Sequence, residues 1–198
     1  MKLRTAPIFI LLLWSSAPLL WQLYTSFSTD QALVTPFAEL ADRWTLQHYR
    51  SVISSNPPFF LYLWNSFFVG ALSTLLTLLV ALPAAYSLSK MPTAKSNIVR
   101  MFLIGCALFP YVLLFLALLE IARTLSLGNS LFALALPYAA LSQPLAILLL
   151  GSAFAAIPSE LDDAARVEGL SLLNRFRWIY IPLLAPALAS TAILIFLF

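Results

Sequence analysis

Long runs of apolar residues, separated by short polar stretches, constrain this chain more than any other feature of its sequence. A helix needs roughly 20 apolar residues to cross about 30 Å of hydrocarbon. Because the core of a bilayer offers no hydrogen bonds to the backbone, such runs must form helices. The sequence therefore predicts an all-α, polytopic membrane bundle, with a last span that is incomplete where the sequence stops. The predicted spans lie near 6–27, 61–89, 100–121, 131–156 and 182–198.

The composition agrees with a membrane protein. Hydrophobic residues make up 62% of the 198 residues and charged residues 10%, whereas about 25% of the residues in a water-soluble domain are charged. The net charge is +3, but the basic residues stand at the ends of the apolar runs. We therefore expect membrane lipid around the chain, and no nucleic acid.

The distribution of Lys and Arg predicts which segments face the cytoplasm. Positively charged loops remain on the cytoplasmic side. This rule places the N-terminus and the loop 157–181 inside, and the segment 28–60 outside. The inner basic residues are Lys2, Arg4, Lys90, Lys95, Arg100, Arg166, Arg175 and Arg177, and the outer ones are Arg43, Arg50 and Arg123.

The first apolar run follows Lys2 and Arg4 closely, as the apolar part of a cleavable signal peptide would. Its length, its Trp14 and Trp21, and the lack of a clear small-x-small cleavage site favour a retained span. The rest of the topology is the same in either case.

The outer segment 28–60 contains a short amphipathic pattern. Leu46, Tyr49, Val52 and Ile53 recur at three- and four-residue spacing, which predicts a short helix that ends before Pro57-Pro58. Its Trp and Tyr suit the membrane interface. The same surface would equally serve as a contact for an extracytoplasmic solute-binding protein, and the sequence leaves both alternatives open.

The loop 157–181 has the pattern of two short helices with a glycine between them. Ser159 and Asp162 have the spacing of a capping box at the start of the first helix. Gly169 suits the left-handed position that ends a helix. Ser171 then caps a second helix over 172–180.

Within this loop, an acidic residue, two alanines and a glycine stand at a distinctive spacing. Asp163-Ala164-Ala165 is followed by Gly169 and then by Ile179-Tyr180-Ile181-Pro182. The pattern closely resembles the "EAA" loop of permease subunits in binding-protein-dependent ABC importers, where the membrane subunit contacts its ATPase. Asp163 stands where this family usually has Glu, and Glu168 where it usually has Asp. The resemblance implies that the coupling residues are Glu160, Asp163, Ala164, Ala165, Gly169, Ile179 and Pro182.

The resemblance extends over most of the chain, from about Arg43 onward. Asn65-Ser66, Leu127 to Ser130, and Gln143-Pro144 are placed as in the carbohydrate-type permeases that include the second maltose and glycerol-phosphate permeases. It implies the type I permease fold, a sugar or related small solute, and the inner or plasma membrane of a bacterium or archaeon. It also implies partners: ATPase subunits that bind ATP, a second permease subunit and an extracytoplasmic solute-binding protein. Such permeases usually have six spans, so we expect a fragment or a shortened gene product.

We find no pattern of catalytic residues in the sequence. Cys106 and His48 are solitary, and no nucleophile–base pair, metal-ligand cluster or G-x4-G-K-S/T phosphate loop is present. We expect no catalytic residue, no metal and no cofactor in this chain, and hence no enzyme activity of its own.

Polar side chains at mid-membrane depth mark a possible solute pathway, because facing them toward lipid is costly. The candidates are Gln143, Tyr138 and Ser142 in the fourth span and Tyr111 in the third. Their amide, phenol and hydroxyl groups suit the hydroxyls of a neutral sugar. Hydrogen bonding between helices of the same subunit is the competing explanation.

Two other functions are compatible with a polytopic chain. An ion-coupled secondary transporter needs ionisable groups deep in the membrane, and here the complete spans carry charge only near their edges. A non-transporting membrane subunit is the other alternative, because the last span is incomplete.

Overall fold

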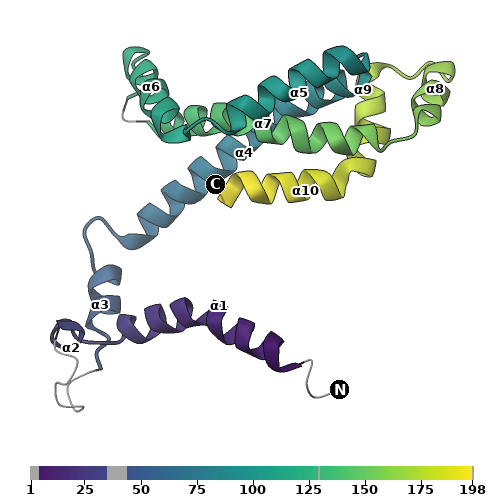
Figure 1. The fold of residues 1–198 in the computed structure, drawn as a ribbon. Helices are drawn as coiled ribbons and strands as arrows, with labels where there is room; N and C mark the ends of the chain where they lie inside the picture. Colours follow the sequence, from purple (N-terminus) through teal and green to yellow (C-terminus); the bar gives the residue numbers. More distant parts are fainter. Residues whose placement is uncertain (1–4, 35–43, 129, 198) are drawn as a thin grey trace. The chain divides into compact units, whose positions relative to one another are not determined.

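A computed structural model describes residues 5–34, 44–128 and 130–197 of the chain. These residues are mostly helical, and none of them lies in a β-strand (Figure 1). The chain divides into two compact units, Met1–Leu63 and Trp64–Phe198. The all-α fold class predicted from the apolar runs is confirmed.

The described part of the first unit includes α1 over Thr5–Ser26, α2 over Asp30–Val34 and α3 over Gln47–Ile53. Helix α1 coincides with the first predicted span. Helix α3 is the short helix that the amphipathic pattern predicts. The Phe27 and Tyr49 rings lie 5.3 Å apart, and the Ser26 and Tyr49 hydroxyls are 2.7 Å apart, so α3 packs back on the end of α1. Lys2, Arg4 and Arg43 lie outside the described residues.

The second unit is a helical bundle in which α7 is the central helix. Helix α7 packs against α5, α6 and α10, and Figure 1 shows α5, α7 and α10 running side by side. Helix α4 enters this unit at Trp64. The helices are α4 over Phe59–Lys90, α5 over Thr93–Ala107, α6 over Tyr111–Thr124, α7 over Leu131–Ala155, α8 over Ser159–Val167, α9 over Leu172–Arg175, the π turn η2 over Phe176–Tyr180, and α10 over Ile181–Leu197.

Small residues let α4 approach α7 closely. Ser73, Thr77, Ala81 and Ala85 recur every four residues on α4, and all four are buried. The Thr77 hydroxyl donates to the Ala139 carbonyl of α7 at 3.3 Å. In a membrane bundle, close van der Waals packing and such bonds replace the hydrophobic effect as the force between helices.

Among the described residues, three helices are long and apolar enough to cross a bilayer: Phe59–Lys90, Leu131–Ala155 and Leu172–Leu197. They coincide with the predicted spans 61–89, 131–156 and 182–198, except that the last helix begins earlier. The helix expected over 172–180 begins where predicted, and the Ser171 hydroxyl accepts from the Asn174 N–H at 3.3 Å. It does not end at Tyr180, because α9, η2 and α10 are continuous. The π turn ends two residues before Pro182, whose missing N–H interrupts α-helical bonding, and a π turn accommodates such an interruption.

The third predicted span, near 100–121, differs from the expected straight helix. Helices α5 and α6 meet at an angle of 87°, as a broken span or a re-entrant pair. The break lies at Leu108–Pro110. Proline has no N–H to donate and disfavours a helical conformation at the preceding residue, so α5 ends before Pro110 and α6 starts after it.

Candidate functional site

Helix α8 carries the acidic-A-A pattern and lies beyond one end of the bundle (Figure 1). It ends at Val167, and Gly169 has a φ of 75°. The Gly169 N–H donates to the Arg166 carbonyl and the Leu170 N–H to the Ala165 carbonyl, both at 3.0 Å. These two bonds form a Schellman motif. The glycine thus ends the helix in the left-handed conformation that its position in the sequence predicts.

The start of α8 differs from the prediction. The N-cap residue is Pro158, and no side chain caps the helix, so the capping box of Ser159 and Asp162 is wrong. Ser159 is already the first helical residue. The Asp162 side chain is instead 5% exposed and binds groups of the bundle.

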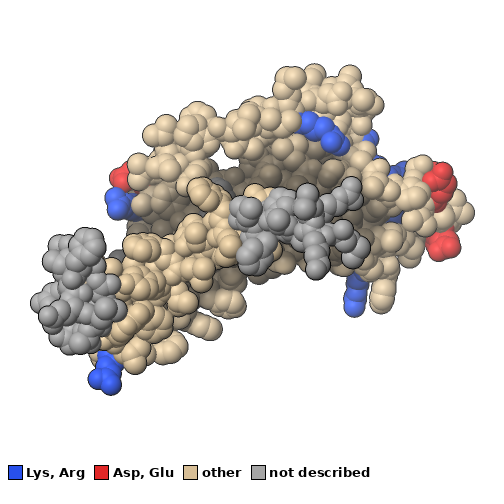
Figure 2. Space-filling view, turned by 60° about the horizontal axis from the view of Figure 1, so that its bottom comes forward, with Lys and Arg blue, Asp and Glu red and all other residues tan. Residues whose placement is uncertain are grey.

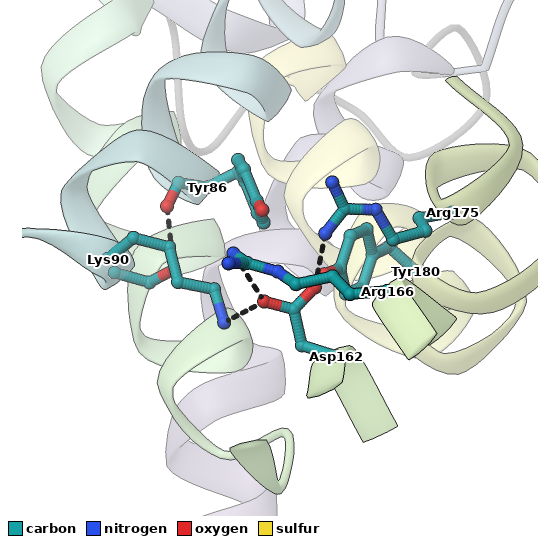
Figure 3. Close-up of polar contacts among 7 residues, drawn as sticks. Tyr86, Lys90, Asp162, Arg166, Arg175 and Tyr180 are labelled. Carbon is teal, nitrogen blue, oxygen red and sulfur yellow. Dashed lines mark hydrogen bonds and ion pairs between the residues drawn. The ribbon is translucent and has the colours of Figure 1, made fainter. Parts of the chain in front are cut away.

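Asp162 lies at the centre of a polar cluster built from four elements (Figure 3). Lys90 Nζ, from the end of α4, is 2.8 Å from Asp162 Oδ2, and Arg166 Nη2 of α8 donates to the same oxygen at 3.1 Å. Arg175 Nη1 of α9 donates to Oδ1 at 2.7 Å, and the Tyr180 hydroxyl of η2 donates to Oδ1 as well. These five residues are called the Asp162 cluster below.

The cluster keeps the carboxylate ionised. Burial by itself would raise the pKa of Asp162. Hydrogen bonds from Lys90, Tyr180 and Arg175 outweigh burial and hold the pKa of this carboxyl far below its ordinary value of 3.8. Asp162 is therefore an anion at neutral pH, surrounded by three cations.

Next to the Asp162 cluster, four aromatic rings connect α4, α7 and η2. Tyr86 of α4, Phe154 of α7, and Phe176 and Tyr180 of η2 pack with ring centroids between 5.2 and 6.2 Å apart. Lys90 Nζ lies 5.8 Å from the centroid of the Tyr86 ring. The polar cluster thus adjoins a packed layer of aromatic rings.

Of the seven residues predicted to couple the loop to an ATPase, two are turned toward the bundle and five are exposed. Ala165 is buried and Ile179 is half-buried. The other five are exposed: Glu160, Asp163, Ala164, Gly169 and Pro182.

The outward surface of α8 and α9 is both acidic and apolar. Val167 is 90% exposed and Leu173 is 78% exposed. Acidic side chains gather over α8 in Figure 2, where Glu160, Asp163 and Glu168 are exposed. These five residues are called the outward face below.

The sequence reasoning missed the roles of Lys90, Asp162, Arg175 and Tyr180. The sequence Asp162-Asp163 does not indicate which of the two aspartates is buried against the bundle. The spacing of Asp162 and Arg166 by one helical turn was the one local signal available. Lys90 is distant in the sequence, and only the packing of α4 beside the loop brings it to the carboxylate.

Comparisons with known proteins agree with this architecture. The chain is 37% identical over 195 residues to the sulfoquinovosyl glycerol transport system permease protein SmoH of Agrobacterium fabrum. The alignment covers 98% of this chain and 68% of SmoH. The chain belongs to the sugar ABC transporter permease family. It is also 34% identical over 182 residues to the trehalose/maltose transport system permease protein MalG of Thermococcus litoralis, over 91% of this chain and 65% of that protein.

A solved structure shows the same fold. The permease chain matches a chain from a bacterial ABC transporter involved in the import of the acidic polysaccharide alginate, with a TM-score of 0.76, 22% sequence identity, and coverage of 99% of this chain and 69% of that chain. No family model matches the sequence. The permease chain thus spans about two thirds of the length of the proteins it matches.

The four predicted pathway residues of the permease are not gathered in one place. Tyr138 lines a cavity of about 430 Å³ between α4, α7 and α10, together with Asn65, Ser66 and Ser73. Those three polar residues were not among the predicted ones. The resemblance to carbohydrate-type permeases includes the Asn65-Ser66 pair, and two polar residues near the start of a long apolar run are the signal that could have identified it.

Tyr111 and Ser142 line a smaller cavity of about 180 Å³ beside the α5–α6 break, with Cys106. The Ser142 hydroxyl donates to the Tyr138 carbonyl of its own helix at 2.9 Å. Gln143 Nε2 donates to the Thr77 carbonyl of α4 at 3.4 Å, and its Oε1 is buried without a hydrogen-bond partner among the described residues. For Gln143 the structure therefore favours bonding between helices, the competing explanation.

Proposed function

We propose that this permease chain is a membrane subunit of an ATP-driven importer of a sugar or related small solute, and that it engages separate ATPase subunits through α8. The observation that carries the proposal is the outward face. It combines exposed acidic and apolar side chains of α8 and the residues that follow it, and α8 lies beyond one end of the bundle. The printed names of the relatives support the solute class, since they are permease proteins for sulfoquinovosyl glycerol, trehalose/maltose and multiple sugars.

In this proposal ATP is bound and hydrolysed by the partner, and the chain has no cofactor or catalysis of its own. The ATPase subunit packs against Val167 and Leu173, and burying each would stabilise the contact by about 1.5–3 kcal/mol. The acidic residues of the outward face meet basic groups of the ATPase. Closure of the nucleotide-binding subunits then moves α8 as a rigid body, and the attached helices switch the pathway between its two open states.

The proposal includes a second permease subunit and an extracytoplasmic solute-binding protein. Many large apolar side chains of α5 and α6 are exposed, such as Met101, Phe102 and Leu113. They suit lipid or a second membrane subunit. The cavity that holds Tyr138 and Asn65 has the size of a small-molecule site and polar groups that fit sugar hydroxyls, so we place the solute there.

Site-specific crosslinking tests the proposal. Val167→Cys, in the importer assembled with its ATPase and second permease in membranes, is expected to crosslink to the ATPase subunit. Glu120→Cys, on α6 and also exposed, is the matched control and is expected to form no such crosslink. Absence of a crosslink from Val167→Cys, or sugar uptake that continues without the ATPase, would contradict the proposed function. The second result would favour an ion-coupled transporter.

A further inference from the structure

We propose that Asp162 is a positioning residue, which fastens α8 to the ends of α4 and of the last helix so that the loop and these helices move as one body. This inference rests on the proposed function of α8 as the contact for an ATPase. It concerns a residue that makes no contact with that partner, because the Asp162 side chain is 5% exposed.

Asp162 bonds to α4, which is distant from α8 in the sequence, and to α9 and η2, which follow the turn at Gly169. Lys90 is the last residue of α4, and Arg175 and Tyr180 lie in α9 and η2, at the start of the helix that continues into α10. The chain itself attaches α8 to α7 through Ala156–Pro158 and to α9 through Glu168–Ser171. Besides these two short connections, α8 is held by the buried Ala165 and by the Asp162 cluster. Ala165 offers only non-directional packing, so the polar contacts of the cluster fix the orientation of α8.

Both carboxylate oxygens are needed for this attachment. Oδ2 receives Lys90 and Arg166, and Oδ1 receives Arg175 and Tyr180. An asparagine has one acceptor oxygen, and its N–H groups would face cations. Replacing Asp162 with Asn would therefore leave at least one cation without its partner, and the Arg175 side chain is only 12% exposed. An uncompensated buried charge is costly, so the cluster would open.

The neighbouring residue is of the same type and has the opposite environment. Asp163 is exposed on the outward face, whereas Asp162 is directed into the bundle. The two adjacent aspartates thus have separate tasks: Asp162 holds the helix in place and Asp163 is available to the partner. This division provides a matched pair of variants.

The first measurement is a distance that needs no ATPase. Spin labels at Val167→Cys in α8 and Ser87→Cys in α4, both exposed positions, report how firmly α8 is held in the full chain in membranes. We expect one narrow distance distribution in the parent and in Asp163→Asn, and a broad one in Asp162→Asn. A distribution in Asp162→Asn as narrow as that in Asp163→Asn would overturn the inference.

The second measurement is the number of solute molecules imported per ATP hydrolysed by the assembled importer. A role in stability alone would lower the amount of importer and leave this ratio unchanged. We expect Asp162→Asn to keep ATP hydrolysis and to lower the ratio about tenfold or more, and Glu120→Gln on α6 to leave it unchanged. An unchanged ratio in Asp162→Asn would overturn the inference.

A second set of variants keeps the test decisive if Asp162→Asn fails to accumulate. Lys90→Gln and Tyr180→Phe each remove one donor and leave the carboxylate with its other partners. Both are expected to broaden the spin-label distance, and unchanged distances in both would overturn the inference. If the distance broadens in these variants while no ATPase binds α8 in the parent, the attachment stands and the proposed function fails.

Discussion

At the scale of single residues, Gly169 is the position where backbone conformation decides the outcome. Its φ of 75° costs about 1–2 kcal/mol for a residue with a Cβ, although no atom would obstruct that Cβ. Gly169→Ala is thus expected to weaken the coupling of ATP hydrolysis to uptake mildly. Gly169→Pro, which fixes φ near −65° and removes the N–H bond to Arg166, is expected to abolish coupling while the protein stays in the membrane.

The ratio of uptake to ATP hydrolysis in reconstituted vesicles measures this effect. Asn tolerates the left-handed conformation better than other residues with a side chain, so Gly169→Asn serves as the control and should couple at least as well as Gly169→Ala. Normal coupling in Gly169→Pro would show that the turn after α8 has no part in transmission.

The pKa of Asp162 gives a second prediction at this scale. A carboxyl whose pKa is lowered on folding contributes stability that is fully present above its ordinary pKa of 3.8. That contribution is lost only as the pH falls through the lower folded pKa. The difference in melting temperature between the parent and Asp162→Asn is therefore expected to stay constant from about pH 5 to pH 8. If the difference disappears by about pH 6, the carboxylate is not held as an anion in the folded chain.

At the scale of elements, the contact of α4 with α7 depends on small side chains. Ala81 is fully buried in the core that α4 shares with α7, η2 and α10, and inserting a larger side chain into such a core typically costs about 1–3 kcal/mol. Ala81→Leu is expected to lower the melting temperature of the purified permease in detergent. Ser87→Leu, at an exposed position of the same helix, should have a much smaller effect. Equal effects of both would mean that α4 and α7 do not pack closely.

At the scale of the whole molecule, the outward face is expected to set the affinity for the ATPase. Val167→Asp and Leu173→Asp each place a charge where an apolar side chain would be buried. Each is expected to weaken binding by at least about tenfold, which corresponds to about 1.4 kcal/mol. Co-purification of the ATPase with the membrane subunit measures this, with Ser54→Asp at the exposed end of α3 as the control. Undiminished co-purification in both variants would exclude this face as the contact.

Much of the candidate site could be predicted from the sequence because it depends on local chemistry. Gly169 ends its helix through bonds that span only a few residues. The prediction of Asp162 as part of a capping box is wrong because its role depends on residues outside α8. Its local role as a capping residue competes with three donors from α4, α9 and η2, and their position depends on how the helices pack.

The sequence by itself determined the helical fold class, the approximate ends of the long apolar helices and the loop pattern that indicates the family. These properties follow from hydrophobic length and from residue spacing, which act within one segment at a time. Only the tertiary structure decided the sharp bend between α5 and α6, the separate cavities of Tyr138 and Tyr111, and the inward turn of Asp162 rather than Asp163. The physical reason is that a charged or polar group is buried only where other groups can pair with it. Those groups come from segments far apart in the sequence, so the residues around one position do not identify them.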